Sequence, residues 1–239
     1  MSALKYKRIL VKISGEALAG ERGTGLDFPV VEQVCSQLKK CCEMGCQVSV
    51  VVGAGNFWRG RNGNSMDQFR ADNMGMLATV MNVLALQDTL LKMGVDARAM
   101  SAVPMEKFAE TYCREKAVSH LEKGRIVILG GGTGNPYFTT DTGAVLRAVE
   151  LDVDAALLAK NIDGVYTADP RKDPNAVKLP RISYTEVLKR DLKVIDASAA
   201  AMCRDNNLKV LLFELGNGEN IVKAVAGDDT VGTLLENEE

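Results

Sequence analysis

Residues 125–150 read Arg-Ile-Val-Ile-Leu-Gly-Gly-Gly-Thr-Gly-Asn-Pro-Tyr-Phe-Thr-Thr-Asp-Thr-Gly-Ala-Val-Leu-Arg-Ala-Val-Glu. The apolar run Arg125–Leu129 is typical of a buried strand, and Thr142–Glu150 has the apolar spacing of a helix. A loop rich in glycine and threonine separates them. Strand, glycine-rich loop and helix in this order form the unit from which α/β folds are built.

The same alternation continues along the chain in both directions. Further strands are predicted at Arg8–Ile13, Gln47–Val52, Ala155–Leu158 and Lys209–Phe213, and further helices at Pro29–Met44, Ala71–Met93, Pro104–Glu122 and Tyr184–Arg190. Strands that alternate with helices pair mainly in parallel. We therefore predict a single domain over residues 1–239 with an α/β fold, a three-layer αβα sandwich around a mainly parallel central sheet. Pro170–Pro180 is interpreted as a surface excursion of that domain.

Composition excludes several classes of protein. The 239 residues carry a net charge of −2, whereas a general nucleic-acid binder usually has a large basic field. No uninterrupted apolar run reaches the roughly 18 residues that span a bilayer, and no signal-peptide core follows Met1. We expect a cytoplasmic protein that binds neither nucleic acid nor membrane. Its only histidine, His120, falls in a predicted helix, so a solvated or capping role is expected there rather than catalysis.

Two loops near the N-terminus have the chemistry of phosphate binding. In Lys12-Ile-Ser-Gly-Glu-Ala-Leu18, the lysine ends a strand, and Ser14 and Gly15 offer backbone N–H groups. In Gly53-Ala-Gly-Asn-Phe-Trp-Arg-Gly60, glycines permit close approach of a phosphate, and Arg59 has the planar fork that binds one. A dinucleotide-binding motif is excluded because Trp58 stands where its third glycine belongs.

Two later loops add further polar groups. Gly130–Asp141 combines backbone donors, three threonines and a carboxylate at a helix start, where Asp141 either caps the helix or holds Mg²⁺. Lys160–Pro170 contains an Asp-Gly turn followed by Tyr166, which offers a shelf for a base. The sequence has no GxxxxGK[ST] motif, and neither an HRD loop nor a DFG triplet, so P-loop NTPases and protein kinases are excluded.

Taken in order, these loops resemble those of the bacterial UMP kinases (uridylate kinases) of the amino acid kinase superfamily. The resemblance covers about residues 6–235 and includes the segment Asp72-Asn-Met-Gly-Met-Leu-Ala-Thr-Val-Met-Asn82. It implies an acetylglutamate kinase-like fold and transfer of the γ-phosphoryl group of ATP to UMP, with Mg²⁺, in de novo pyrimidine synthesis. One departure is Ala54, which replaces a usual glycine.

The resemblance also implies a role for each matching residue. Catalysis would involve Lys12, Asp141 and Asp196, the last two organising Mg²⁺ and Lys12. The ATP-binding residues would be Lys12, Ser14, Gly15, Gly55, Arg59, Lys160, Asn161, Tyr166 and Asp169. The UMP-binding residues would be Ala54, Asp72, Thr133, Gly134, Asn135, Pro136, Tyr137, Phe138, Thr139 and Thr140.

Regulation is implied by the resemblance as well. Members of the family are typically homohexamers that GTP activates and UTP inhibits. The residues that match the family's effector response are Gly20, Glu21, Arg22, Gly23, Thr24 and Gly25, together with Arg98 and Arg125. Gln87 and Leu91 replace expected polar partners there.

Two other functions stay open at this point. The first is phosphorylation of a carboxylate or carbamate by another enzyme of the superfamily, which would need an amino-acid or carbamate site in place of Thr133–Thr140. The second is oxoanion storage or nucleotide sensing on the same fold, although such a protein need not retain Lys12, Arg59, Asp141 and Asp196 together.

Overall fold

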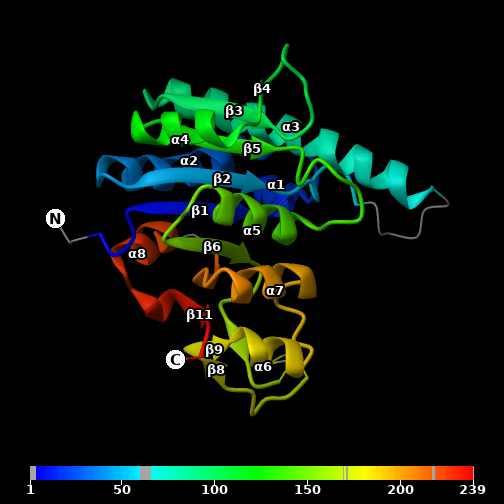
Figure 1. Ribbon diagram of the computed structural model, residues 1–239, viewed down its shortest axis with the longest axis vertical. Coiled ribbons are helices and arrows are strands. Elements are labelled where there is room, and N and C mark those ends of the chain that lie inside the picture. The colour runs from blue at the N-terminus through cyan, green and yellow to red at the C-terminus, as the bar shows by residue number, and fades with distance from the viewer. Residues whose placement is uncertain (1–3, 60–65, 169, 171, 217–218, 239) are drawn as a thin grey trace.

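The computed structural model describes residues 4–59, 66–168, 170, 172–216 and 219–238. A nine-stranded sheet crosses the molecule in the order β4-β3-β5-β2-β1-β6-β10-β11-β9 (Figure 1). Its strands are β1 (Arg8–Ile13), β2 (Gln47–Val52), β3 (Ala97–Ser101), β4 (Glu110–Thr111), β5 (Ile126–Gly130), β6 (Ala155–Lys160), β9 (Arg181–Ser183), β10 (Val210–Glu214) and β11 (Gly232–Glu236). Every pairing in this sheet is parallel except that of β10 with β11.

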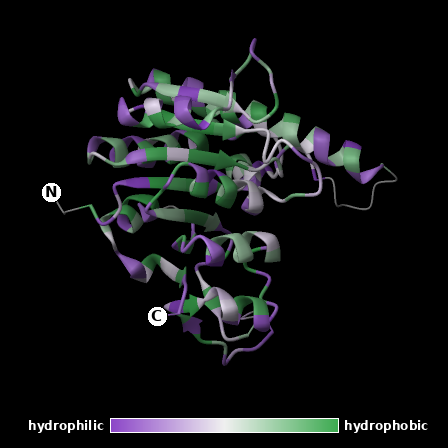
Figure 2. Ribbon diagram, viewed as in Figure 1, coloured by the Kyte–Doolittle hydropathy of each residue, from purple (hydrophilic) through white to green (hydrophobic). Residues whose placement is uncertain are grey.

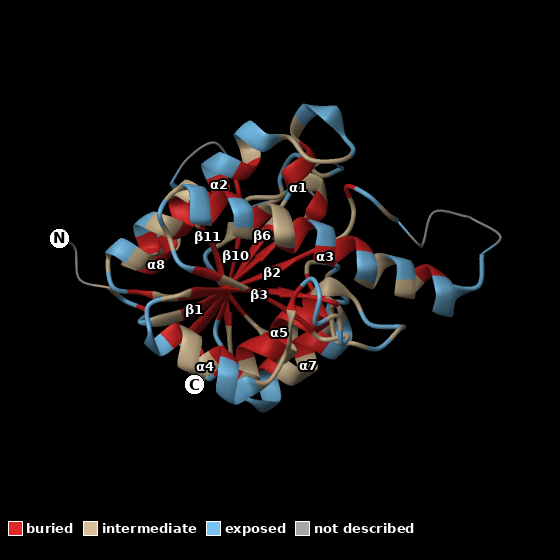
Figure 3. Cartoon of the chain, turned by 90° about the horizontal axis from the view of Figure 1, so that it is seen from above, coloured by how far each residue is buried: buried red, intermediate tan, exposed pale blue. Residues whose placement is uncertain are grey.

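Helices cover both faces of the sheet (Figure 3). One layer contains α1 (Gly15–Ala19), α2 (Phe28–Glu43), α3 (Gln68–Lys92) and α8 (Asn220–Ala226). The other contains α4 (Arg114–Glu122), α5 (Thr140–Glu150), α6 (Tyr184–Lys189) and α7 (Ala197–Asp205). Short 3₁₀ turns lie at Gly20–Arg22 and Asp229–Val231. The predicted three-layer αβα sandwich is confirmed.

The sheet separates two apolar cores, and its strands are the most apolar part of the chain (Figure 2). Side chains alternate between the faces of a strand. In β1, Ile9, Val11 and Ile13 therefore pack with α2, while Leu10 packs with α5 on the other side. Lys12 has the same parity as Leu10, so the alternation directs this lysine towards α5.

One predicted helix was wrong in part. Pro104–Glu122 is helical only from Arg114, and upstream Glu110–Thr111 forms the edge strand β4, which pairs with Met100–Ser101 of β3. The buried Ala109 and this strand pairing outweigh local helix propensity. Sequence patterns also missed β3, α7, α8 and β11. These elements are short, and their folding depends on neighbours in the sheet or the helix layer.

The excursion at Pro170–Pro180 is attached to the main sheet. It is bounded by a two-stranded sheet of β7 (Val165–Tyr166) and β8 (Lys178–Leu179). The Thr233 hydroxyl of β11 accepts a hydrogen bond from the Val165 N–H (2.8 Å) and donates one to the Leu179 carbonyl (2.6 Å). One side chain of the main sheet therefore holds both strands of the excursion.

Helix α3 is long and apolar enough, by length and composition alone, to cross a membrane. It packs on β3, β5 and α2, and the hydroxyl of Thr79 and the amide of Asn82 on this helix bond to loops of the domain. These contacts are those of a core helix in a folded α/β domain.

Candidate active site

Lys12 lies at the carboxyl end of β1, in the middle of the sheet, where loops from neighbouring strands converge. Its side chain points to the start of α5, and its Nζ atom is 3.1 Å from Asp141 Oδ1. Only 7% of Lys12 is exposed. A buried ammonium needs a counter-charge, and Asp141 supplies it.

Asp141 is shared by two lysines. It is the second residue of α5, a helix capped by the Thr139 hydroxyl, which accepts a hydrogen bond from the Thr142 N–H (3.2 Å). Its Oδ2 atom accepts a hydrogen bond from Lys160 at the end of β6. Burial opposes ionisation of Asp141, but the two ammonium groups outweigh it and hold its pKa below the usual range. Burial lowers the pKa of Lys160, an effect that the Asp141 carboxylate opposes.

Asp141 Oδ1 is also the atom best suited to face a metal ion. It is buried and accepts no hydrogen bond, although Lys12 lies beside it. Within the described ranges, no group of three His, Cys, Asp or Glu side chains is arranged to hold an ion. Mg²⁺ typically binds one or two carboxylates together with waters and substrate phosphates. The residues present therefore fit a Mg²⁺ ion that arrives with a nucleotide, and Asp141 would be the carboxylate that holds it.

Asp196 connects the starts of α5 and α7. It caps α7, accepting a hydrogen bond from the Ala199 N–H (2.9 Å). It also accepts hydrogen bonds from the hydroxyls of Thr139 and Thr142, the latter at 2.9 Å. Asp196 thus holds the first turn of α5, and with it Asp141. Its predicted part in organising Mg²⁺ and Lys12 stays a prediction.

A first cavity of about 410 Å³ opens beside Thr140, the residue before Asp141. Of the predicted site residues, those that line it are Ala54, Arg59, Asp72, Thr133, Asn135, Phe138, Thr139 and Thr140. Gly134, Pro136 and Tyr137 are outside its lining, and Tyr137 is 67% exposed. The Tyr137 N–H nevertheless donates a hydrogen bond to Asp72 Oδ2 (2.8 Å). Asp72 therefore holds the middle of the loop Gly130–Asp141.

Arg59 lines this first cavity, and its contact with the donor phosphates stays a prediction. Its Nη2 atom is 3.0 Å from Glu16 Oε1, and its Nε atom donates to the Gly55 carbonyl (3.3 Å). Glu16 lines the same cavity. The guanidinium thus lies between the lysine loop (Lys12–Leu18) and the glycine loop (Gly53–Arg59). An anion bound in the first cavity would be within its reach.

A second cavity of about 530 Å³ is lined by Lys160, one lysine of the pair. Lys160, Asn161 and Tyr166, which are predicted to bind ATP, are part of its lining. Its remaining wall includes four apolar side chains that sequence patterns did not single out: Ile162, Val165, Leu192 and Val194. Apolar walls with a few polar groups suit a planar base. Asp169 lies outside the described residues.

Sequence and structure comparisons agree with this geometry. A model of the amino acid kinase family matches residues 7–214. The chain belongs to the amino acid kinase family.

Solved structures place this amino acid kinase near one branch of its family. It is similar to the UMP kinase from Bacillus anthracis, with 36% identity, a TM-score of 0.91 and coverage of 98% of this chain and 97% of that one. The UMP kinase from Ureaplasma parvum gives 35% identity, a TM-score of 0.91 and coverage of 98% and 100%. The uridylate kinase from Archaeoglobus fulgidus is more distant, with 28% identity, a TM-score of 0.72 and coverage of 95% and 99%.

The predicted effector residues of this amino acid kinase fall in two separate places. Gly20 and Glu21 border a third cavity, of about 670 Å³, which Lys160 and Asn161 also line at the carboxyl end of β6. Arg98 and Arg125 lie at the opposite, amino ends of β3 and β5. In the described chain the two groups do not meet.

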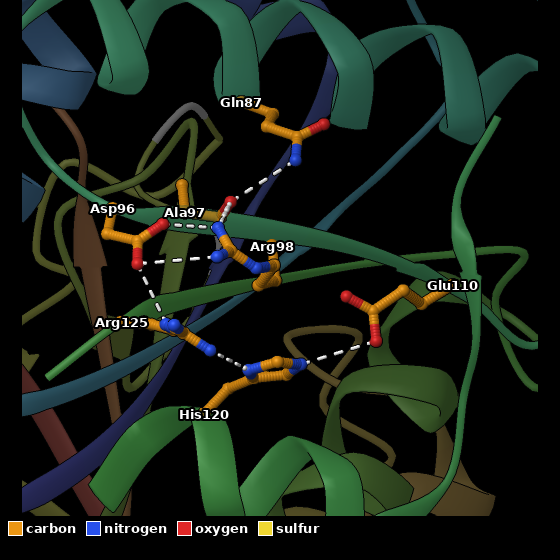
Figure 4. Close-up of polar contacts among 7 residues, drawn as sticks. All are labelled: Gln87, Asp96, Ala97, Arg98, Glu110, His120 and Arg125. Atoms are coloured by element: carbon orange, nitrogen blue, oxygen red, sulfur yellow. Dashed lines mark hydrogen bonds and ion pairs between the residues drawn. The ribbon is translucent and has the colours of Figure 1, made fainter. Parts of the chain in front are cut away.

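Arg98 and Arg125 converge on one carboxylate (Figure 4). Arg98 pairs with Asp96, and Arg125 Nε donates to Asp96 Oδ2 (2.8 Å). His120 joins this cluster, with Nδ1 3.1 Å from Arg125 Nη1 and Nε2 3.3 Å from Glu110 Oε2. The expectation of a solvated or capping His120 was therefore wrong, because its ring bridges two charged side chains. The Asp96 carboxyl is little buried, and both guanidinium groups lower its pKa.

Several residues of the kinase site escaped prediction. Glu16, Trp58, Met76 and Thr79 line the first cavity, and Asn82 lies behind it. The available signal was polarity, since Thr79 and Asn82 interrupt an apolar helix one turn apart. Buried polar side chains at that spacing indicate a helix face that holds something other than the core.

Proposed function

We propose that this amino acid kinase transfers the γ-phosphoryl group of ATP to UMP and forms UDP and ADP. The observation that carries the proposal is that two lysines share Asp141 at the carboxyl ends of the strands, next to residues that line two cavities. Thr140, beside Asp141, lines the first cavity, and Lys160 lines the second. Similarity to two UMP kinases at 35–36% identity over nearly the whole chain supports UMP as the acceptor.

Charge neutralisation is the main task of the site in this reaction. A phosphate oxygen of UMP attacks the γ-phosphorus of ATP, and the bond from that phosphorus to the bridging oxygen of ADP breaks. The UMP phosphate is ionised at neutral pH and needs no general base. Lys12 and Lys160 offset the negative charge on the transferred group, while backbone N–H groups of the glycine loops orient it. A Mg²⁺ ion held with the nucleotide by Asp141 would supply further neutralisation of phosphate charge.

The direct test measures ADP release with ATP and each candidate acceptor: UMP, CMP, dUMP, acetylglutamate and aspartate. We expect UMP to be the fastest substrate. Faster turnover of a carboxylate would assign the chain to another branch of the family, and nucleotide binding without ADP release would indicate a storage or sensing protein.

Lys12→Ala tests the role of the first lysine. We expect kcat to fall about 10²- to 10³-fold, the usual effect of losing an electrostatic group that acts in the transition state. Lys189→Ala is the control, because Lys189 is an exposed surface lysine that pairs with Glu186 (3.7 Å). Turnover by folded Lys12→Ala near the wild-type rate would contradict this mechanism.

We further propose that the chain works in the cytoplasm, in pyrimidine nucleotide synthesis, as a homohexamer that GTP activates and UTP inhibits. For assembly, the support is an exposed apolar face on α3. For effector binding, it is the cationic pair at Asp96.

The effector proposal has its own test. Arg98→Ala or Arg125→Ala should reduce the ratio of the rates measured with and without GTP. An unchanged ratio in both variants would exclude this cluster as the effector site. Arg181→Ala is the control, since Arg181 also pairs with two carboxylates but lies beside β11.

A further inference from the structure

Two asparagines form a closed pair beneath the loop Gly53–Arg59. Asn56 Nδ2 donates to Asn82 Oδ1 (2.8 Å), and Asn82 Nδ2 donates to Asn56 Oδ1 (2.8 Å). Asn56 is 2% exposed and Asn82 is fully buried. Burying two amides is costly unless their hydrogen bonds are satisfied, so this pair keeps its geometry only if its other partners stay in place.

Those other partners are backbone atoms of two loops. Asn82 Nδ2 also donates to the Gly53 carbonyl (2.8 Å), and Asn56 Nδ2 to the Gly25 carbonyl (2.7 Å). The Asn56 carbonyl in turn accepts hydrogen bonds from the Gly25 N–H (2.9 Å) and the Thr24 hydroxyl (3.0 Å). Both N–H groups of each side-chain amide are used, and the pair thereby joins the glycine loop to Thr24-Gly25.

The lysine loop meets the same pair. A Cβ atom added at Gly15 would lie 2.4 Å from Asn56 Oδ1, 2.6 Å from the Gly53 carbonyl and 2.7 Å from the Gly55 nitrogen. Only glycine fits there, so the start of α1 is packed directly on the asparagines. Lys12 is three residues upstream, and the placement of the pair therefore determines how its loop meets the glycine loop.

Helix α3 also holds the loop Gly130–Asp141, through a residue one turn away from Asn82. The Thr79 hydroxyl accepts a hydrogen bond from the Gly131 N–H (2.8 Å), one helical turn from Asn82. Thr79 and Asp72 of this helix line the first cavity. A single helix thus fixes Gly53 and Gly131, which follow two neighbouring strands of the sheet.

We propose that Asn82, acting with Asn56, is a positioning residue for phosphoryl transfer. The pair touches neither cavity lining, and it sets the distance between the lysine loop and the glycine loop. This inference rests on the proposed kinase function. Misplacing reacting groups by about 1 Å costs on the order of 10²-fold in rate, so loss of the pair should act on kcat.

The test compares Asn82→Asp and Asn82→Ala with Thr89→Val. Asp is nearly isosteric with Asn but turns the donor that faces the Gly53 carbonyl and Asn56 Oδ1 into an acceptor. Thr89 is a matched control, because it is buried on the same helix and its hydroxyl donates only within that helix, to the Ala85 carbonyl (2.9 Å). Activity is measured at 15 °C per mole of folded protein, with the folded fraction taken from circular dichroism, so that a destabilised variant still gives a value.

Both Asn82 variants should lose roughly 10- to 100-fold in kcat, with the KM values for ATP and UMP changed by less than about threefold. Thr89→Val should keep the wild-type kcat. Asn56→Ala with Asn82→Ala should lose no more than the worse single variant, because groups that act as one unit are not additive. A wild-type kcat in Asn82→Asp, an equal loss in Thr89→Val, or additive losses would overturn the proposal.

Wild-type turnover in the same assay separates the two proposals. If the wild-type chain phosphorylates another acceptor instead of UMP, the function proposed above fails, and the same variants are compared with that acceptor. If it phosphorylates UMP but the Asn82 variants match it, only the positioning role fails.

Discussion

Asp141 is the residue on which the candidate site depends, because each of its oxygens faces a different lysine. Lys12 comes from β1 and Lys160 from β6, strands that pair side by side, while Asp141 enters from the helix layer above them. Without the Asp141 carboxylate, the two ammonium groups would repel each other in a site that is largely buried. The carboxylate holds both ammonium groups at one point, and these three groups together carry one positive charge, which suits a phosphoryl group.

Asp141→Asn should therefore destabilise the fold in a pH-dependent way. The folded-state pKa of Asp141 is depressed, so its contribution is fully present above the ordinary value of about 3.9 and is lost as pH falls through the lower folded value. At pH 7 the variant leaves two buried cations without a counter-charge, at a cost of about 3 kcal/mol. Urea unfolding should show that Asp141→Asn has a lower free energy of unfolding than wild type at pH 7. The difference between the two proteins should be smaller at about pH 3.

The control for this experiment is Asp191→Asn, which removes an exposed carboxylate paired with Lys193. It should leave the free energy of unfolding nearly unchanged at both pH values. A difference between wild type and Asp141→Asn that is the same at both pH values would contradict the depressed pKa.

At the scale of elements, the site is made by the ends of strands and the starts of helices. α1 begins at Gly15 after a Ser14 cap, whose hydroxyl accepts a hydrogen bond from the Ala17 N–H (3.2 Å), and α5 begins after the Thr139 cap. α3 runs past both glycine loops and contributes polar groups to each. Close packing of backbone on backbone at these junctions explains why small residues are required there.

Gly15→Ala and Gly75→Ala should have opposite effects on stability. At Gly15 a methyl group would meet atoms at 2.4–2.7 Å, and such overpacking costs about 1–3 kcal/mol. At Gly75, inside α3, the nearest atom is Trp58 Cδ1 at 3.8 Å, and alanine gains up to about 1 kcal/mol of helix propensity. Thermal unfolding of both variants checks the signs. If both variants unfold at the same temperature, the loops around Gly15 move apart at little cost in free energy, and the prediction fails.

At the scale of the whole molecule, α3 leaves an apolar face uncovered. Its exposed members are Phe69, Met74, Leu77, Met81 and Leu91. The amino end of the helix extends past the sheet (Figure 1). A single exposed apolar residue is ordinary, but a row of five on one helix is typical of an interface. In the proposed homo-oligomer, a second copy of this chain would cover this face of α3.

Leu77→Glu should reduce the number of subunits per particle, because Leu77 is 55% exposed and a buried carboxylate without a partner is costly. Light scattering coupled to gel filtration at micromolar concentration measures the change. Val177→Glu is the control, since Val177 is 62% exposed on the β7–β8 excursion. A wild-type chain that elutes as a monomer would refute the assembly.

Sequence patterns alone determined the layers of the fold, the main strands and the loops that surround the site, because apolar runs and glycine clusters are local signals. They also placed Lys12 at a strand end and Asp141 at a helix start. Only the tertiary structure decided which of these residues meet: that Asp141 contacts two lysines, that Asp196 bonds to the first turn of α5, that Arg59 lines the first cavity, and that Asn56 meets Asn82. These partners come from segments distant in the chain, and their hydrogen bonds and ion pairs depend on distances that only the packing of strands and helices determines.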